Sequence, residues 1–215
     1  MPDELKKTQL RTIQYFYMDG SFEIGFALLC LFLAFFFHVE NLLQGTWFAA
    51  LVDSILVFVV VGGAFLTRRF VRKWKERITF PRTGVVTYPR REGKTRGWII
   101  MFGLVISGAL AAAVMYTLLS NEVSQLSLMP LITGVIFSCV LFFVGWRTSL
   151  PRFHIQATIS LLAGFGLAFT PLGNYVGLAA FYLILGLGLF TSGTIILCNY
   201  LRQNPLPPAE RPNDQ

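Results

Sequence analysis

Long apolar blocks, bounded by charged residues or turn formers, organise this chain. Residues 97–121 and 123–146 contain no charged residue. Each block is long enough for a helix of about 20 residues to cross a hydrocarbon core about 30 Å thick. Residues 155–201 are also uncharged, and the segment 170–174, which contains a proline and a glycine, divides them into two spans. These blocks predict four transmembrane helices.

Two further spans are predicted in the first third of the chain, where single acidic residues interrupt the apolar pattern. Residues 20–39 are long enough to cross if Glu23 extends its carboxylate to the near headgroups. Residues 46–67 contain one charged residue, Asp53, and end before Arg68. The sequence therefore predicts an all-α fold, a polytopic bundle of six transmembrane helices.

The composition and the order of segments agree with a membrane protein. Hydrophobic residues make up 54% of the chain and charged residues 13%, whereas about a quarter of the residues in a soluble domain are charged. The predicted organisation is an N-terminal segment, a helix pair, a basic loop, four further spans and a proline-rich tail expected to be disordered: 1–19, 20–67, 68–96, 97–201 and 202–215.

All 18 Lys and Arg residues fall on one side of this six-span map. The loops predicted on the other side, 39–45, 121–127 and 171–174, contain none. Under the positive-inside rule, both termini and the basic loop lie in the cytoplasm, and we expect the chain in the inner membrane of a bacterium. Orientation and contact with lipid headgroups explain the net charge of +7, so nucleic-acid binding is not expected.

The basic loop has two predicted parts. Residues 68–77 continue the second span as an amphipathic helix at the membrane surface, and residues 78–88 favour a short β-hairpin. For Arg82, near the hairpin tip, the alternatives are a solvated turn or a clamp on the chain's own helices. The residues expected to contact anionic lipid or a partner protein are Arg72, Lys73, Trp74, Lys75 and Arg82.

The same loop carries a motif that points to a family. Residues 75–86, KERITFPRTGVV, resemble the pattern K-E-R-x-T-[YF]-P-R-T-G-Y-V of a family of bacterial multi-pass membrane proteins to which no activity is assigned. Asp19-Gly20 and Glu23-Ile24-Gly25 also resemble that family, whereas Val85 stands where the pattern has Tyr. The resemblance covers the N-terminal part of the chain and implies the multi-pass architecture, with no chemistry attached.

Asp53 is the candidate for a polar site within the bilayer. A charged side chain inside a membrane span costs free energy of insertion, so such a residue is taken first as a candidate for function. It lies roughly 10 Å inside the second span, at a depth matched by Thr133, Ser138 and Tyr182 on other spans. One interpretation is a proton or cation site in a small transporter or channel. The other is a single structural hydrogen bond, with the acid protonated by burial.

A second polar group is predicted at the cytoplasmic end of the first span. Asp19 and Glu23 are four residues apart, so they share one face of a helix. They lie near the point where Arg68 and Arg69 leave the second span. We expect an interhelical ion pair among these four residues.

Catalytic and cofactor motifs are missing from the sequence. The three Cys are isolated within apolar spans, the two His fall on opposite faces of the map, and neither nucleotide-binding nor hydrolase motifs occur. We therefore expect no metal and no cofactor. The absence of motifs favours a protein that is not an enzyme, and a membrane-embedded enzyme acting on lipid stays as a third alternative because a novel site would leave no motif. The leading prediction is an interaction or scaffold protein that contacts lipid or a partner protein through its basic loop, with a homo-oligomer as a further possible assembly. The alternative is a small transporter or channel that uses Asp53.

Overall fold

The computed structural model of this chain describes residues 14, 17–83 and 128–205, with the backbone alone at a few positions that include Asp53. Within these ranges every regular element is a helix, and the helices are α2 (Ser21–Leu42), α3 (Trp47–Trp74), the π-helix η1 (Lys75–Thr79), α4 (Phe80–Thr83), α6 (Leu128–Thr148), α7 (Pro151–Ala168) and α8 (Gly173–Gln203). The predicted all-α fold is confirmed for the part of the chain described.

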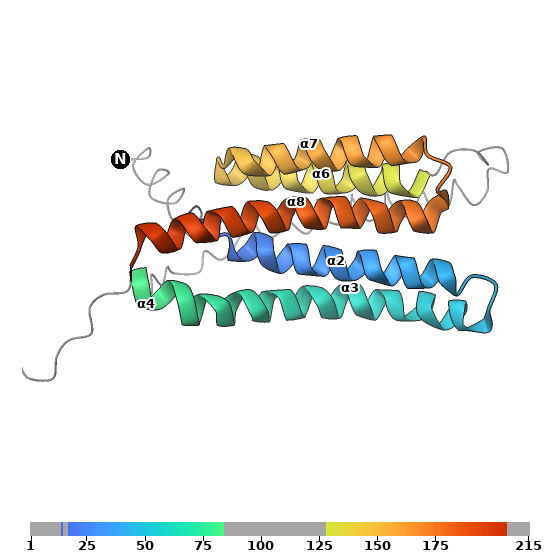
Figure 1. The fold of residues 1–215 in the computed structure, drawn as a ribbon, viewed down its shortest axis with the longest axis horizontal. Coiled ribbons are helices and arrows are strands. Elements are labelled where there is room, and N and C mark those ends of the chain that lie inside the picture. Colours follow the sequence, from blue (N-terminus) through green and yellow to red (C-terminus); the bar gives the residue numbers. More distant parts are fainter. Residues whose placement is uncertain (1–13, 15–16, 84–127, 206–215) are drawn as a thin grey trace, which may run out of the picture.

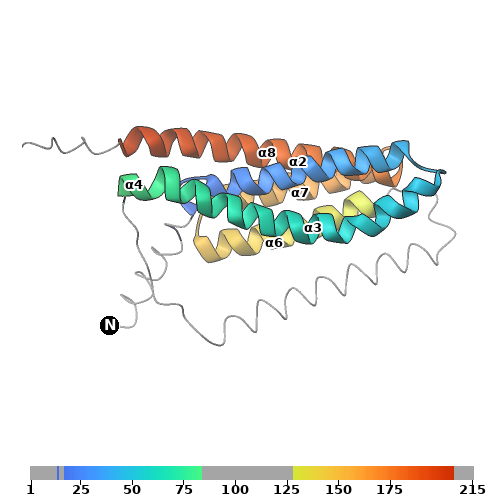
Figure 2. The ribbon, with the colours of Figure 1, turned by 90° about the horizontal axis from the view of Figure 1, so that it is seen from below.

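The five long helices lie side by side along one axis, with α2 and α7 running in one direction and α3, α6 and α8 in the other (Figure 1). Helix α8 contacts α2, α7 and α6, while α3 packs on α2, and α6 packs on α7. Figure 2 shows the same helices, again aligned along one axis, from a second direction. Helices α2 and α7 begin, and α3, α6 and α8 end, at the left of Figure 1. We call this the basic end, because every described Lys and Arg belongs to it.

Four helical segments within the described ranges are long and apolar enough to cross a membrane: Ser21–Leu42, Ser54–Thr79, Leu128–Thr148 and Gly173–Gln203. They correspond to the predicted first, second, fourth and sixth spans. The predicted fifth span is the helix α7, which is not among the four; its first two turns carry Arg152, His154 and Gln156. The predicted third span, 97–121, lies outside the described residues.

Glycine residues allow the helices to pack closely. A Cβ atom on Gly193 of α8 would lie 2.8 Å from the Ile24 side chain of α2, and one on Gly134 of α6 would lie 2.7 Å from the Cα of Gly164 on α7. Alanine and larger apolar side chains complete the core between these helices: Ala27, Cys30, Leu141, Phe153, Ala157, Phe181, Leu185 and Leu189. Small residues at helix interfaces are the usual way in which membrane helices approach one another.

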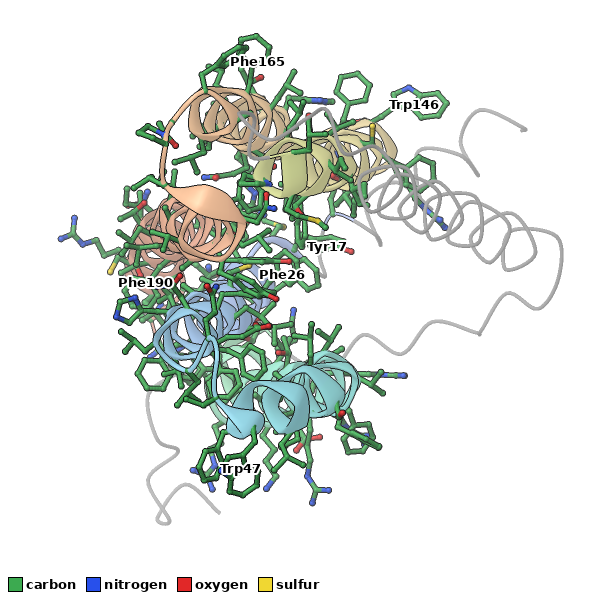
Figure 3. All side chains as sticks on the ribbon, turned by 90° about the vertical axis from the view of Figure 1, so that its right-hand side faces the viewer. Tyr17, Phe26, Trp47, Trp146, Phe165 and Phe190 are labelled. Carbon is green, nitrogen blue, oxygen red and sulfur yellow. The ribbon has the colours of Figure 1, made fainter. Side chains whose placement is uncertain are left out.

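Large apolar side chains also cover the outside of the bundle. Figure 3 shows Trp47, Trp146 and Phe165 pointing away from the helices, and Tyr17 and Phe26 lying between them. Trp47 is 71% exposed and Trp146 72%. An apolar exterior of this extent suits a lipid environment better than water.

The predicted β-hairpin is wrong in its first half. Residues 78–83 are helical, since η1 and α4 continue α3 without a break, and residues 84–88 lie outside the described ranges. Pro81 lacks the N–H that would bond to the preceding turn. The wider π-turn immediately before it is the local adjustment that accompanies this missing donor.

Candidate functional site

Four charged residues are buried together at the basic end of the bundle. Asp19 is 1% exposed, Glu23 2% and Lys75 5%, and the Arg152 side chain is largely buried as well. They come from the turn before α2, from α2, from η1 and from α7. The two acids and two bases balance in charge, which is the condition for burying such groups.

Asp19 is the acceptor for four donor groups. Gly20, with φ of 68°, turns the chain into α2, so that the Ser21 N–H and hydroxyl donate to Asp19 Oδ1 at 3.2 and 2.8 Å. The Thr79 hydroxyl donates to Oδ2 at 2.8 Å. Lys75 Nζ lies 3.2 Å from Oδ1 and 3.1 Å from Oδ2. The carboxylate therefore joins the start of α2 to the helical extension of α3.

The π-helix η1 brings both donors to this carboxylate. Lys75 and Thr79 are its first and last residues. Val71, one turn earlier, is also buried, and a Cβ atom on Gly25 of α2 would lie 2.8 Å from its Cγ2. Val71, Lys75 and Thr79 form what we call the buried stripe, which faces the start of α2. Single π-turns occur frequently at functional sites in helices.

Glu23 forms the second ion pair. Its Oε1 lies 3.0 Å from Arg152 Nε. Arg152 Nη2 also donates to the Tyr17 carbonyl oxygen, and the guanidinium lies 5.3 Å from the centre of the Phe153 ring. Neither Glu23 carboxylate oxygen accepts a hydrogen bond within the described ranges. The interaction is therefore electrostatic, and it connects α2 to α7.

The predicted ion pair forms with different cations. Arg68 and Arg69 are exposed on α3, whereas the two carboxylates pair with Lys75 and Arg152. Val71, Lys75 and Thr79 are spaced four residues apart and share one helical face, and this spacing could have indicated from the sequence that Lys75 faces the bundle. No comparable sequence signal identified Arg152, because its position depends on how α7 packs against α2 and α8.

Two further hydrogen bonds connect distant segments at this end. Arg82 Nη1 donates to the Asn204 carbonyl oxygen at 2.7 Å, which ties α4 to the end of α8. Gln14 Nε2 donates to the Thr148 carbonyl oxygen at 3.0 Å. This hydrogen bond agrees with the predicted alternative in which Arg82 holds its loop against the chain's own helices, and less well with Arg82 as an exposed contact for lipid or a partner.

A stripe of exposed cations lies on the outer side of the same segment. Glu76 stands among them and pairs with Arg72 at 3.0 Å. Trp74, half-buried, contacts the Phe70 ring at 5.3 Å between centroids. Lys75, predicted as a lipid contact, is instead buried on Asp19. The four exposed residues, which we call the cationic face, are Arg69, Arg72, Lys73 and Arg77.

The predicted intramembrane site around Asp53 stays a prediction. Asp53 lies on α3, which packs on α2, and its side chain is outside the described detail. Thr133 and Ser138 lie on α6. The Tyr182 ring, on α8, stacks on Phe37 at 5.5 Å between centroids. Tyr182 thus belongs to an aromatic cluster.

Comparison with known proteins adds no assignment. The sequence matches no family model, no curated protein and no solved structure. Within the described ranges, no group of three or more His, Cys, Asp or Glu residues could hold a metal ion. In the part of the chain that the structure describes, fold and site together define a helical bundle with several helices suited to a membrane and with a charge-balanced cluster at one end.

Proposed function

We propose that this chain is a polytopic protein of the bacterial inner membrane that acts, without catalysis, as an interaction or scaffold protein through its cationic face. The end of α3 supports this proposal because its two sides differ. The buried stripe is held against Asp19 and α2, while the opposite side exposes four cations. The segment therefore has a fixed orientation and an outward surface free to bind.

The length of α3 supports a transmembrane position with the cationic face at the headgroups. Helix α3 has 28 residues, from Trp47 to Trp74. At about 1.5 Å per residue it is about 42 Å long, close to the thickness of about 40–45 Å of a bilayer with its headgroups. Trp residues are enriched at both membrane surfaces. The cationic face, which flanks Trp74, then lies at one of these surfaces.

The ends of the described helices support six spans. Helix α4 ends at the basic end, and α6 begins at the opposite end (Figure 1). The chain between them has to pass from one end to the other. We propose the uncharged segment 97–121 for that crossing and α7 for the fifth span.

The distribution of cations supports the orientation. The basic end contains Arg147, Arg152 and Arg202 as well as the cations of α3, η1 and α4, whereas the turns 43–46 and 169–172 at the opposite end contain no Lys or Arg. Under the positive-inside rule the basic end is cytoplasmic, together with both termini. At this end Asp19 and Glu23 are buried and paired with Lys75 and Arg152, and the exposed Glu76 is paired with Arg72, so we propose no transport site here.

Neutralising the cationic face tests the interaction. In cells carrying Arg72→Gln, Lys73→Gln and Arg77→Gln together, cross-linking in native membranes followed by purification should recover markedly less bound lipid or partner than in the wild type. A variant with Arg147→Gln and Arg202→Gln, exposed cations elsewhere at the basic end, is the control. Equal recovery from the triple variant and the wild type would reject the proposal.

A further inference from the structure

We infer that the ligand of the cationic face is anionic phospholipid of the membrane in which the chain is embedded, with its phosphate groups bound by Arg69, Arg72, Lys73 and Arg77. This inference rests on the proposed function and names its partner. Spacing, depth and fixed orientation each favour a lipid surface over a partner protein.

The spacing makes the cations one surface. Positions 72, 73, 76 and 77 lie three, four, seven and eight residues after position 69, which places the five side chains on one helical face. Four of the five are cationic and all are exposed. The acid among them, Glu76, is already paired with Arg72. Three of the cations are Arg, whose planar guanidinium binds phosphate in a bidentate manner.

The depth puts this surface within reach of headgroups. The cationic face lies on the same continuous helix as the candidate span, Ser54–Thr79, and directly follows its apolar part, so the cations stand at the end of that helix and not on a linker. Phe70 and Trp74, aromatic residues of the kind that lie at headgroup level, alternate with them. Arg and Lys at such a depth extend their charged groups to the headgroup layer. A soluble partner would have to enter that layer to reach them.

The orientation is fixed before any lipid binds. Lys75 and Thr79 hold the inner side of the segment on Asp19, and Arg82 holds its end on the Asn204 carbonyl. A preformed surface loses little conformational freedom on binding. The same contacts bury Lys75 on Asp19, so this cation does not belong to the lipid-binding surface.

Native mass spectrometry of the full chain in detergent tests the inference, with phosphatidylglycerol as the anionic lipid and phosphatidylcholine as the zwitterionic reference. The variant is Arg69→Gln with Lys73→Gln, and the matched control is Arg147→Gln with Arg202→Gln. All four residues are exposed, so both variants should fold with an unchanged thermal midpoint. Since each cation that contacts the bound anionic lipid contributes about fivefold, and Arg147 and Arg202 lie outside the cationic face, only the Arg69 and Lys73 variant should bind phosphatidylglycerol about thirtyfold more weakly.

The outcomes separate the inference from the proposed function. The control should bind phosphatidylglycerol within about threefold of the wild type, and binding of phosphatidylcholine should not change in either variant. Equal weakening in both variants, or none in the Arg69 and Lys73 variant, would overturn the inference. If that variant instead loses a cross-linked protein while binding phosphatidylglycerol normally, the partner is a protein, and only the proposed function survives.

Discussion

Removing the Asp19 carboxylate should destabilise the fold more than removing the Lys75 ammonium, although the two groups form one ion pair. Asp19→Ala leaves a buried ammonium without its counter-charge and takes the acceptor away from the Ser21 and Thr79 hydroxyls. An uncompensated buried charge costs about 3–5 kcal/mol, and each hydrogen bond lost from these hydroxyls about 1 kcal/mol. The expected loss of unfolding free energy is about 5 kcal/mol.

Lys75→Met should cost less because the carboxylate keeps most of its partners. Three hydrogen bonds to Asp19 remain, from the Ser21 N–H, the Ser21 hydroxyl and the Thr79 hydroxyl, at 3.2, 2.8 and 2.8 Å. Met also replaces the apolar part of the lysine side chain. The expected cost is about 2–3 kcal/mol. In the double variant no buried charge is left unpaired, so its cost should fall about 3 kcal/mol below the sum of the single ones.

Unfolding in mixed micelles, followed by Trp fluorescence during a titration with denaturing detergent, measures these differences. Arg72→Met is the control, since it removes the cation of the exposed Arg72–Glu76 pair and should cost less than about 1 kcal/mol. If Lys75→Met costs as much as Asp19→Ala, or if the two single costs add up in the double variant, Asp19 is not the shared acceptor described above.

Two further predictions concern packing and orientation. Gly164→Leu should separate α6 from α7 and cost more than about 2 kcal/mol of stability, because a Cβ at this position would lie 2.8 Å from the Cα of Gly134. Gly166→Leu is the control, since a Cβ there meets nothing within 4 Å, and it should not destabilise the protein in the same unfolding assay. Reporter fusions in the segment 84–96 and after Gln215 should both report the cytoplasm, and a result on opposite sides of the membrane would contradict the proposed orientation.

The helices were predictable from the sequence because a bilayer makes apolar length a strong signal. In lipid each backbone N–H and C=O has to be satisfied within the helix, so an uncharged stretch of sufficient length has few alternatives to a helix. The predicted spans 20–39 and 123–146 match α2 and α6 closely. The first half of the predicted hairpin, residues 78–83, is wrong because β-branched and aromatic residues near Pro81 are weak signals for a strand, and the helix of α3 continues through them.

The partners of the buried acids were not predictable in the same way. Sequence spacing shows which residues share a face of one helix, but it does not show which helices become neighbours. Helix α2 lies against α8 because Gly186 and Gly193 admit it, and α7 then brings Arg152 to Glu23. The ion pair depends on this packing order, which a single sequence does not contain.

Lys75 shows how this difference changes a functional interpretation. By composition it is one of several equivalent cations in a basic loop, and the sequence predicts that it contacts lipid or a partner together with Arg72 and Lys73. The fold divides them, because the stripe through Val71 and Thr79 faces α2 and draws Lys75 onto Asp19. One cation then stabilises the bundle, while its neighbours Arg72 and Lys73 remain on the surface. Counting charges along the loop therefore overestimates the surface available to bind, and the side of the helix decides each residue's role.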